Sequence, residues 1–199
     1  MDVKSRAQAI ITKPKEEWIK IKDESLTVSQ IFSPYVFILA AIPAVAQFIG
    51  LGLVGRRIPF IGWYRYGLGN ALLYAILLYV LSLVSVYLFG IVINALAPSF
   101  GSKQNLPNAM KLAVFSMTPG WIAGVLYIIP MLGILVILAN LYGIYVLYLG
   151  FNTPLMETPK DKVIIYLIVS IVVIVVLMIV VGVILGAIFT VGAVGRGVL

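Results

Sequence analysis

The sequence predicts an all-α fold: an integral membrane bundle of five transmembrane helices, preceded by an amphipathic cytoplasmic helix. Five long apolar runs are the first reason, because about 20 apolar residues in a helix cross the ~30 Å hydrocarbon layer of a bilayer. Composition is the second reason, because 62% of the 199 residues are hydrophobic, 11% are charged and the mean hydropathy is +1.13. Soluble domains carry about 25% charged residues, so the class of soluble proteins is excluded.

The chain divides into a cytoplasmic tail at 1–33 and a five-span domain at 34–199. In lipid, every backbone N–H and C=O must be paired within its own segment, so the apolar runs are helices. Ser33 and Pro34 suit the start of the first span, with proline at the first helical position. Pro130 separates two short spans and makes them a tight helical hairpin. The predicted spans are 34–54, 66–97, 111–130, 131–149 and 162–194.

The distribution of positive charge predicts how the chain threads the membrane. Ten of the fourteen Lys and Arg residues fall in the tail and in the loops at 98–111 and 150–162, and four fall on the other side. The positive-inside rule then predicts a multi-pass protein of the cell (plasma) membrane, with a cytoplasmic N-terminus and an extracytoplasmic C-terminus. The net charge of +7 indicates contact with the bilayer surface. The sequence has no basic stripe interleaved with exposed aromatic residues, so nucleic-acid binding is not expected.

The tail contains an amphipathic segment at 12–24. Trp18 and Ile21 lie three residues apart and share one helical face. We interpret this segment as an interfacial helix on the cytoplasmic leaflet, with Trp18 and Ile21 at the membrane interface. The alternative is that the same face packs against loops of the protein itself. A second helix start follows at Thr27, where Gln30 completes a possible capping box.

The residue types present argue against an enzyme. The chain has no cysteine and no histidine, which removes thiolate nucleophiles and the common zinc and haem ligand sets. No ionisable residue lies well inside a span, whereas proton relays and coupled pumps require one. We therefore expect no catalytic, cofactor-binding or metal-binding residue.

Uncharged polar residues do occur at membrane depth. They form either a polar path between helices or ordinary interhelical hydrogen bonds, each worth about 0.6 kcal/mol on average. The hydrogen-bond interpretation is favoured, because single polar residues commonly join helices in this way. The candidates are Gln47, Asn70, Ser85, Asn140 and Tyr142.

Two pairs of glycines match the small-xxx-small pattern that lets helix backbones approach closely. Gly120 and Gly124 lie in the third span, and Gly182 and Gly186 lie in the fifth. Such matches are frequent in a chain with 18 glycines. The pattern favours packing within one monomer over a dedicated dimer face.

Several of these segments together resemble the Yip family of Ypt/Rab-interacting membrane proteins, in its prokaryotic branch. Residues 12–22 are similar to the P-x-x-x-W-x-x-I lead-in of that family, and 38–44 are similar to its first span. The third and fourth spans resemble the family at 111–119, 129–133 and 145–150. The resemblance implies a five-helix domain with a cytoplasmic N-terminus.

In eukaryotic members, the resemblance implies binding of Rab-type GTPases and a role in vesicle traffic between endoplasmic reticulum and Golgi. This chain lacks the Asp-Leu-Tyr-Gly-Pro motif that precedes the first span in many of those members, and its tail is short. Both departures point away from a Rab partner and toward a bacterial or archaeal source.

The sequence thus predicts a non-enzymatic, membrane-organising or partner-recruiting protein of the trafficking type. Its partners are the lipid bilayer and either another membrane or cytoplasmic protein or a second copy of the chain. The rival is a channel, small-solute transporter or lipid-moving protein, which a continuous cavity lined by the candidate polar residues would favour. Cytoplasmic loops hold the candidate partner-binding residues Lys103, Gln104, Asn105, Glu157, Lys160 and Asp161.

Overall fold

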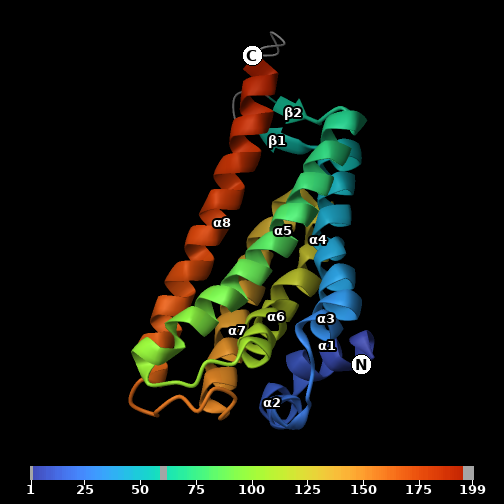
Figure 1. Ribbon diagram of the computed structural model, residues 1–199. Coiled ribbons are helices and arrows are strands. Elements are labelled where there is room, and N and C mark those ends of the chain that lie inside the picture. The colour runs from blue at the N-terminus through green and yellow to red at the C-terminus, as the bar shows by residue number, and fades with distance from the viewer. Residues whose placement is uncertain (1, 59–61, 195–199) are drawn as a thin grey trace.

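A computed structural model describes residues 2–58 and 62–194 of the chain as a bundle of long helices (Figure 1). Five helical stretches are long and apolar enough to cross a membrane, so the predicted all-α class and span count are confirmed. Each overlaps one of the predicted spans. They are Val28–Val54, Leu68–Phe100, Leu106–Ile128, Pro130–Asn152 and Val163–Phe189.

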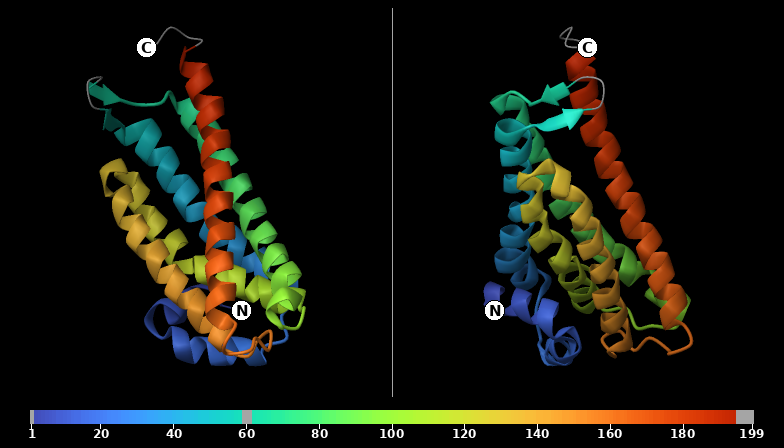
Figure 2. Two further views of the ribbon diagram at one scale, coloured as in Figure 1. Left: turned by 90° about the vertical axis from the view of Figure 1, so that its left-hand side faces the viewer. Right: turned by 180° about the vertical axis from the view of Figure 1, so that it is seen from behind.

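One end of the bundle, called here the tail end, carries α1 (Val3–Thr12) and α2 (Pro14–Asp23). The loops at 101–105 and 153–162 lie at the same end (Figures 1 and 2). Asp2 caps α1 by accepting a 3.0 Å hydrogen bond from the Ser5 backbone N–H, and hydrogen bonding to Ser5 lowers the pKa of the Asp2 carboxyl.

The opposite end, called the hairpin end, carries an antiparallel pair of short strands, β1 (Arg56–Ile58) and β2 (Gly62–Tyr64). No strand is predicted between the first and second spans. Gly55 lies at a φ of 81° directly before β1, a backbone conformation that glycine adopts without strain. The last helix, α8 (Val163–Val194), also ends at this side (Figure 1). The first and last elements thus lie at opposite ends, as an odd number of crossings requires.

The first span begins earlier than Pro34. Thr27 forms a complete capping box with Gln30, as the tail pattern predicts, and the helix continues from Val28. A wide π turn at Phe32–Val36 carries the chain past Pro34, which has no N–H to donate. The two predicted helix starts therefore belong to one helix, composed of α3 (Val28–Ile31), η1 (Phe32–Val36), α4 (Phe37–Ile49) and η2 (Gly50–Val54).

The remaining helices differ in how deeply they are buried. In its most apolar stretch, the third span is 67% buried, whereas the fifth, within α8, is 17% buried. The third span is therefore the centre of the bundle, and α8 lies at its edge (Figure 2). The elements concerned are α5 (Leu68–Leu96), η3 (Ala97–Phe100), α6 (Leu106–Ala123), η4 (Gly124–Ile128), η5 (Pro130–Leu132) and α7 (Gly133–Asn152).

Candidate functional site

The tail is packed into the bundle by Trp18. Its indole N–H donates a 2.9 Å hydrogen bond to the backbone carbonyl of Val146 in α7, and its ring meets Phe115 of α6 edge-on at 6.2 Å between centroids. The side chain is 1% exposed. Gly150 makes room for it, because a Cβ at that position would lie 2.7 Å from Trp18 Cζ2. α7 therefore contains a notch shaped for this indole.

A buried group of charges lies beneath α2. Arg6 pairs with Glu17 at 2.5 Å and with Glu24, and its guanidinium lies 5.8 Å from the centre of the Phe115 ring. Lys111 of α6 is 2% exposed and donates hydrogen bonds of 3.0 Å and 2.5 Å to the backbone carbonyls of Ile21 and Glu24. These carbonyls end α2, so the ammonium group caps the negative end of that helix.

The interface role predicted for Trp18 and Ile21 therefore needs correction. Both side chains are buried in the core that the tail shares with the transmembrane helices, with Ile21 at 0% exposure. The tail segment packs on the protein, but against α6 and α7 rather than against loops. An amphipathic face looks the same in sequence whether lipid or protein covers it.

Sequence reasoning missed Lys111 as a partner of the tail, and Arg6 as an ion-pair partner within the tail. Lys111 looks like a headgroup-level lysine, because it lies near one end of a span. One signal was present in the sequence: Lys111 lies between the apolar residues Met110 and Leu112, and a lysine flanked by apolar residues can be buried when its ammonium group has a partner.

The two predicted partner-binding loops meet at the tail end. Lys103 forms a 2.7 Å ion pair with Glu157, and its backbone N–H donates to the Met156 carbonyl at 2.8 Å. Asn105 caps α6 by accepting a 3.0 Å bond from the Asn108 backbone N–H. All six predicted residues are exposed: Lys103, Gln104, Asn105, Glu157, Lys160 and Asp161.

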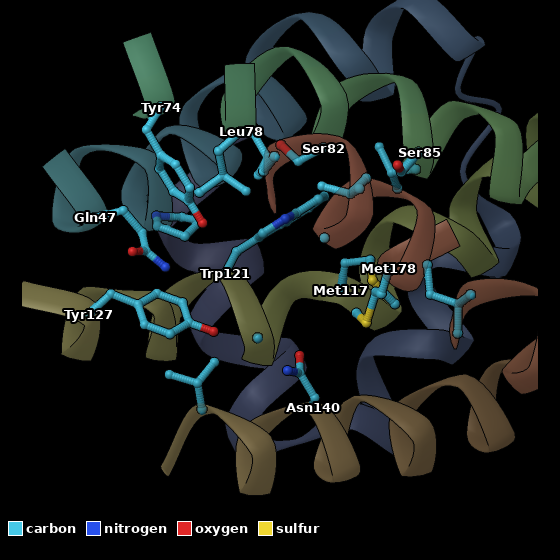
Figure 3. Close-up of a pocket in the computed structure, with 18 residues that line it drawn as sticks. Gln47, Tyr74, Leu78, Ser82, Ser85, Met117, Trp121, Tyr127, Asn140 and Met178 are labelled. Atoms are coloured by element: carbon cyan, nitrogen blue, oxygen red, sulfur yellow. The ribbon is translucent and has the colours of Figure 1, made fainter. Parts of the chain in front are cut away.

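A cavity of about 330 Å³ lies between α4, α5, α6, η4, α7 and α8. In Figure 3, Gln47, Tyr127 and Asn140 point toward its middle, and Trp121 crosses it. Ser82 and Ser85 face it from α5. Tyr74 also lines it, the other lining residues are mostly apolar, and none of the lining residues is charged.

The cavity gathers only part of the predicted polar set. Gln47, Ser85 and Asn140 line it, whereas Asn70 and Tyr142 do not. The Tyr142 hydroxyl instead donates a 2.8 Å hydrogen bond to the Ile11 carbonyl in the tail. The candidate polar residues therefore do not all line one space: three of them line a local cavity, and Tyr142 forms a hydrogen bond of the favoured kind.

The four candidate packing glycines divide into two kinds. A Cβ at Gly120 would collide with Asn140 Oδ1, and one at Gly124 would lie 2.7 Å from Pro43 Cβ. At Gly182 and Gly186, a Cβ would have no atom of the described chain within 4 Å. The small-xxx-small pattern on α8 therefore serves no close helix contact among the described residues, and Gly182 lines the cavity instead.

Metal binding finds no support in the described ranges. Across residues 2–58 and 62–194, no three His, Cys, Asp or Glu side chains lie together in a way that could hold a metal ion.

The comparisons with known proteins agree with this architecture. The family model for the Yip1 domain matches residues 9–194. The chain is 28% identical over 154 residues to the inner membrane protein YohC of Escherichia coli K12, covering 73% of this chain and 76% of that protein. The same values hold for YohC of an E. coli O6:H1 strain. No solved structure matches the chain. Because the family model spans nearly all of its length, including the tail helix and all five candidate spans, the chain belongs to the Yip1 domain family of membrane proteins.

Proposed function

We propose that this protein is a non-enzymatic, multi-pass protein of the cell membrane that presents its tail end to a protein partner. One observation carries the proposal: two loops and the tail form an ordered, charged surface at one end of the bundle. Hydrogen bonds between the loops hold it, including Ser102 to Thr158 at 2.9 Å and Asn108 to the Leu155 carbonyl at 2.7 Å. A surface ordered in this way meets a partner without first losing loop entropy.

Local strain in the same loop supports the proposal. Glu157 has a φ of 51°, the left-handed conformation that a side chain other than glycine rarely adopts. Its carboxylate pairs with Lys103 and is still well exposed. Strained, exposed residues are concentrated at functional sites, because the surrounding structure must hold them in place.

The orientation of this surface belongs to the same proposal. The positive-inside rule assigns the tail end to the cytoplasm, and the related YohC is an inner membrane protein. Reporter fusions at Val3 and after Ala187, near the hairpin end of α8, should give cytoplasmic and extracytoplasmic signals respectively. Cytoplasmic signals from both fusions would contradict the proposed arrangement.

The partner is tested by co-purification from native membranes after crosslinking, followed by mass spectrometry. Reversing two exposed charges of the tail end, Lys160→Glu with Asp161→Lys, should abolish capture of the partner and leave the net charge unchanged. Arg65→Glu, an exposed charge at the hairpin end, is the control and should retain capture. Equal capture by all three proteins would contradict a partner at the tail end.

A further inference from the structure

The cavity contains amide groups that the protein itself does not pair. No hydrogen bond joins the Gln47 or Asn140 amide to another residue in the described part of the chain, whereas the hydroxyls of Tyr35 and Tyr142 are both paired. At membrane depth, an unpaired amide costs free energy that a bonding partner recovers. Both groups point into the same space (Figure 3). The missing partner is therefore a molecule that enters the cavity.

The lining restricts the chemistry of that molecule. With no charged residue in the wall, nothing compensates a phosphate or an ammonium group. The amides donate and accept hydrogen bonds, which suits ester carbonyls and hydroxyls. Apolar side chains such as Leu78, Val86 and Leu185 complete the wall and suit hydrocarbon. The occupant is thus uncharged and amphiphilic.

Size and position indicate a lipid rather than a soluble molecule. About 330 Å³ is near the lower bound of ligand pockets and holds a head region, not a whole lipid. The α8 residues that line the cavity run from Ile174 to Leu185, and two of them, Met178 and Gly182, are also exposed on the outside of the bundle. Figure 2 shows α7 and α8 closer together at the tail end, beside the loop that joins them, than toward the hairpin end. The cavity lies in this widening, where acyl chains reach the bilayer.

We propose that the cavity binds the head of an uncharged glycerolipid of the diacylglycerol type, with its ester and hydroxyl groups on Gln47 and Asn140 and its chains along α8. The site differs from the surface assigned to a partner, because it lies among the helices and not at the tail end. Loss of partner capture and loss of lipid binding are thus independent results.

The test uses the full chain in nanodiscs of phosphatidylethanolamine and phosphatidylglycerol, with a photoactivatable diacylglycerol as the probe. We expect saturable labelling of α8 peptides by this probe. A photoactivatable phosphatidylglycerol with the same acyl chains should label them at least about tenfold less, because its phosphate finds no countercharge in the cavity.

Glycines on α8 provide matched variants. A side chain at either Gly182 or Gly186 meets no described atom, but only Gly182 lines the cavity. Gly182→Phe should fill the cavity and abolish saturable labelling, whereas Gly186→Phe should label as the parent does. Undiminished labelling of Gly182→Phe would overturn the proposal.

The amides provide a second pair of variants. Gln47→Leu combined with Asn140→Leu should reduce labelling about tenfold, the change expected from losing one to two hydrogen bonds. Asn70→Leu removes an amide outside the cavity and should have no effect. Unchanged thermal unfolding of the variants shows that the fold is retained. Equal labelling by the anionic probe would overturn lipid binding in favour of a nonspecific surface. A solute leak through vesicles that Gly182→Phe stops would overturn it in favour of a water-filled path.

Discussion

The two halves of the bundle treat their polar residues in opposite ways. Toward the tail end, several buried polar groups are bonded within the protein: Trp18 bonds Val146, Lys111 bonds the end of α2, and the hydroxyls of Tyr35 and Thr118 bond each other at 2.8 Å. Asn94 Oδ1, by contrast, is buried there without a partner among the described residues. Around the cavity, the amides of Gln47 and Asn140 point into open space. Polar residues in the first region hold helices together, and those in the second are available to a ligand.

This difference shows that a polar residue at membrane depth can either join helices or face a cavity, and its residue type does not decide which. Asn140 and Tyr142 are two positions apart on α7, yet Asn140 faces the cavity and Tyr142 bonds the tail. The side of α7 on which each residue lies determines whether it faces the cavity or bonds the tail. The comparison predicts that substitutions of polar residues near the tail end destabilise the protein, whereas those around the cavity do not.

The largest expected effect comes from Trp18→Ala. Truncating a buried tryptophan costs about 3–5 kcal/mol, and this variant also leaves the Val146 carbonyl without its side-chain donor. The tail should detach from α6 and α7, and a protease should cut it rapidly in protein solubilised from membranes. Ile19→Ala, which removes a side chain that is 62% exposed, is the control. Equal cleavage rates for the two variants would mean that the tail is not docked.

Lys111→Met should have the next largest effect. The methionine keeps the apolar stem but leaves the carbonyls of Ile21 and Glu24 without their cationic donor. Hydrogen bonds to charged groups contribute about 1.5–3 kcal/mol, so the free energy of unfolding should fall by that amount in a denaturant titration. Lys22→Met, at an exposed position of α2, should change it little. An unchanged free energy of unfolding in Lys111→Met would show that the ammonium group is solvated.

Tyr35→Phe should have a smaller effect. It removes only the hydroxyl that bonds Thr118, and an interhelical hydrogen bond in a membrane contributes about 0.6 kcal/mol on average. The midpoint of thermal unfolding in detergent should fall slightly. Tyr87→Phe loses a hydroxyl that bonds no other described residue, and its midpoint should stay that of the parent. If the thermal midpoint fell equally in both variants, the effect would come from losing a phenol hydroxyl and not from losing the hydrogen bond to Thr118.

The smallest effect is expected for Asn140→Leu. Leucine has nearly the shape of asparagine, and the amide makes no hydrogen bond to the described protein, so stability should be unchanged or raised. The measurement is the same thermal midpoint in the ligand-free protein. A loss comparable to that of Lys111→Met would show that the cavity amides are structural and would remove the contrast between the two halves.

Much of the fold was predictable, because apolar runs and prolines determine it locally. The five spans and the hairpin at Pro130 follow from length and residue type alone. The capping box at Thr27 follows from a four-residue pattern. The tail could not be placed, because Val146, which bonds Trp18, and Lys111, which bonds the end of α2, lie on distant helices and the amphipathic pattern does not identify them.

The candidate site was predictable only as a set of residue types. Asn70 and Asn140 carry the same amide group, and the packing of several helices, which the sequence does not give, places only Asn140 in the wall of the cavity. Gly182 and Gly186 match a close-packing motif, yet neither is packed against another described helix. Because α8 lies at the edge of the bundle, the small-xxx-small motif on it does not mark a close helix contact among the described residues.

The bond between Trp18 and Val146 also determines when the tail can be sheltered during synthesis. The two residues are 128 positions apart in the chain, and ribosomes add about 5–20 residues per second. The indole therefore waits for roughly 6–26 s before its acceptor exists. Throughout that interval the first helices must enter the membrane with the tail undocked. Burial of Trp18 against α7 thus requires that the fourth span has already been made.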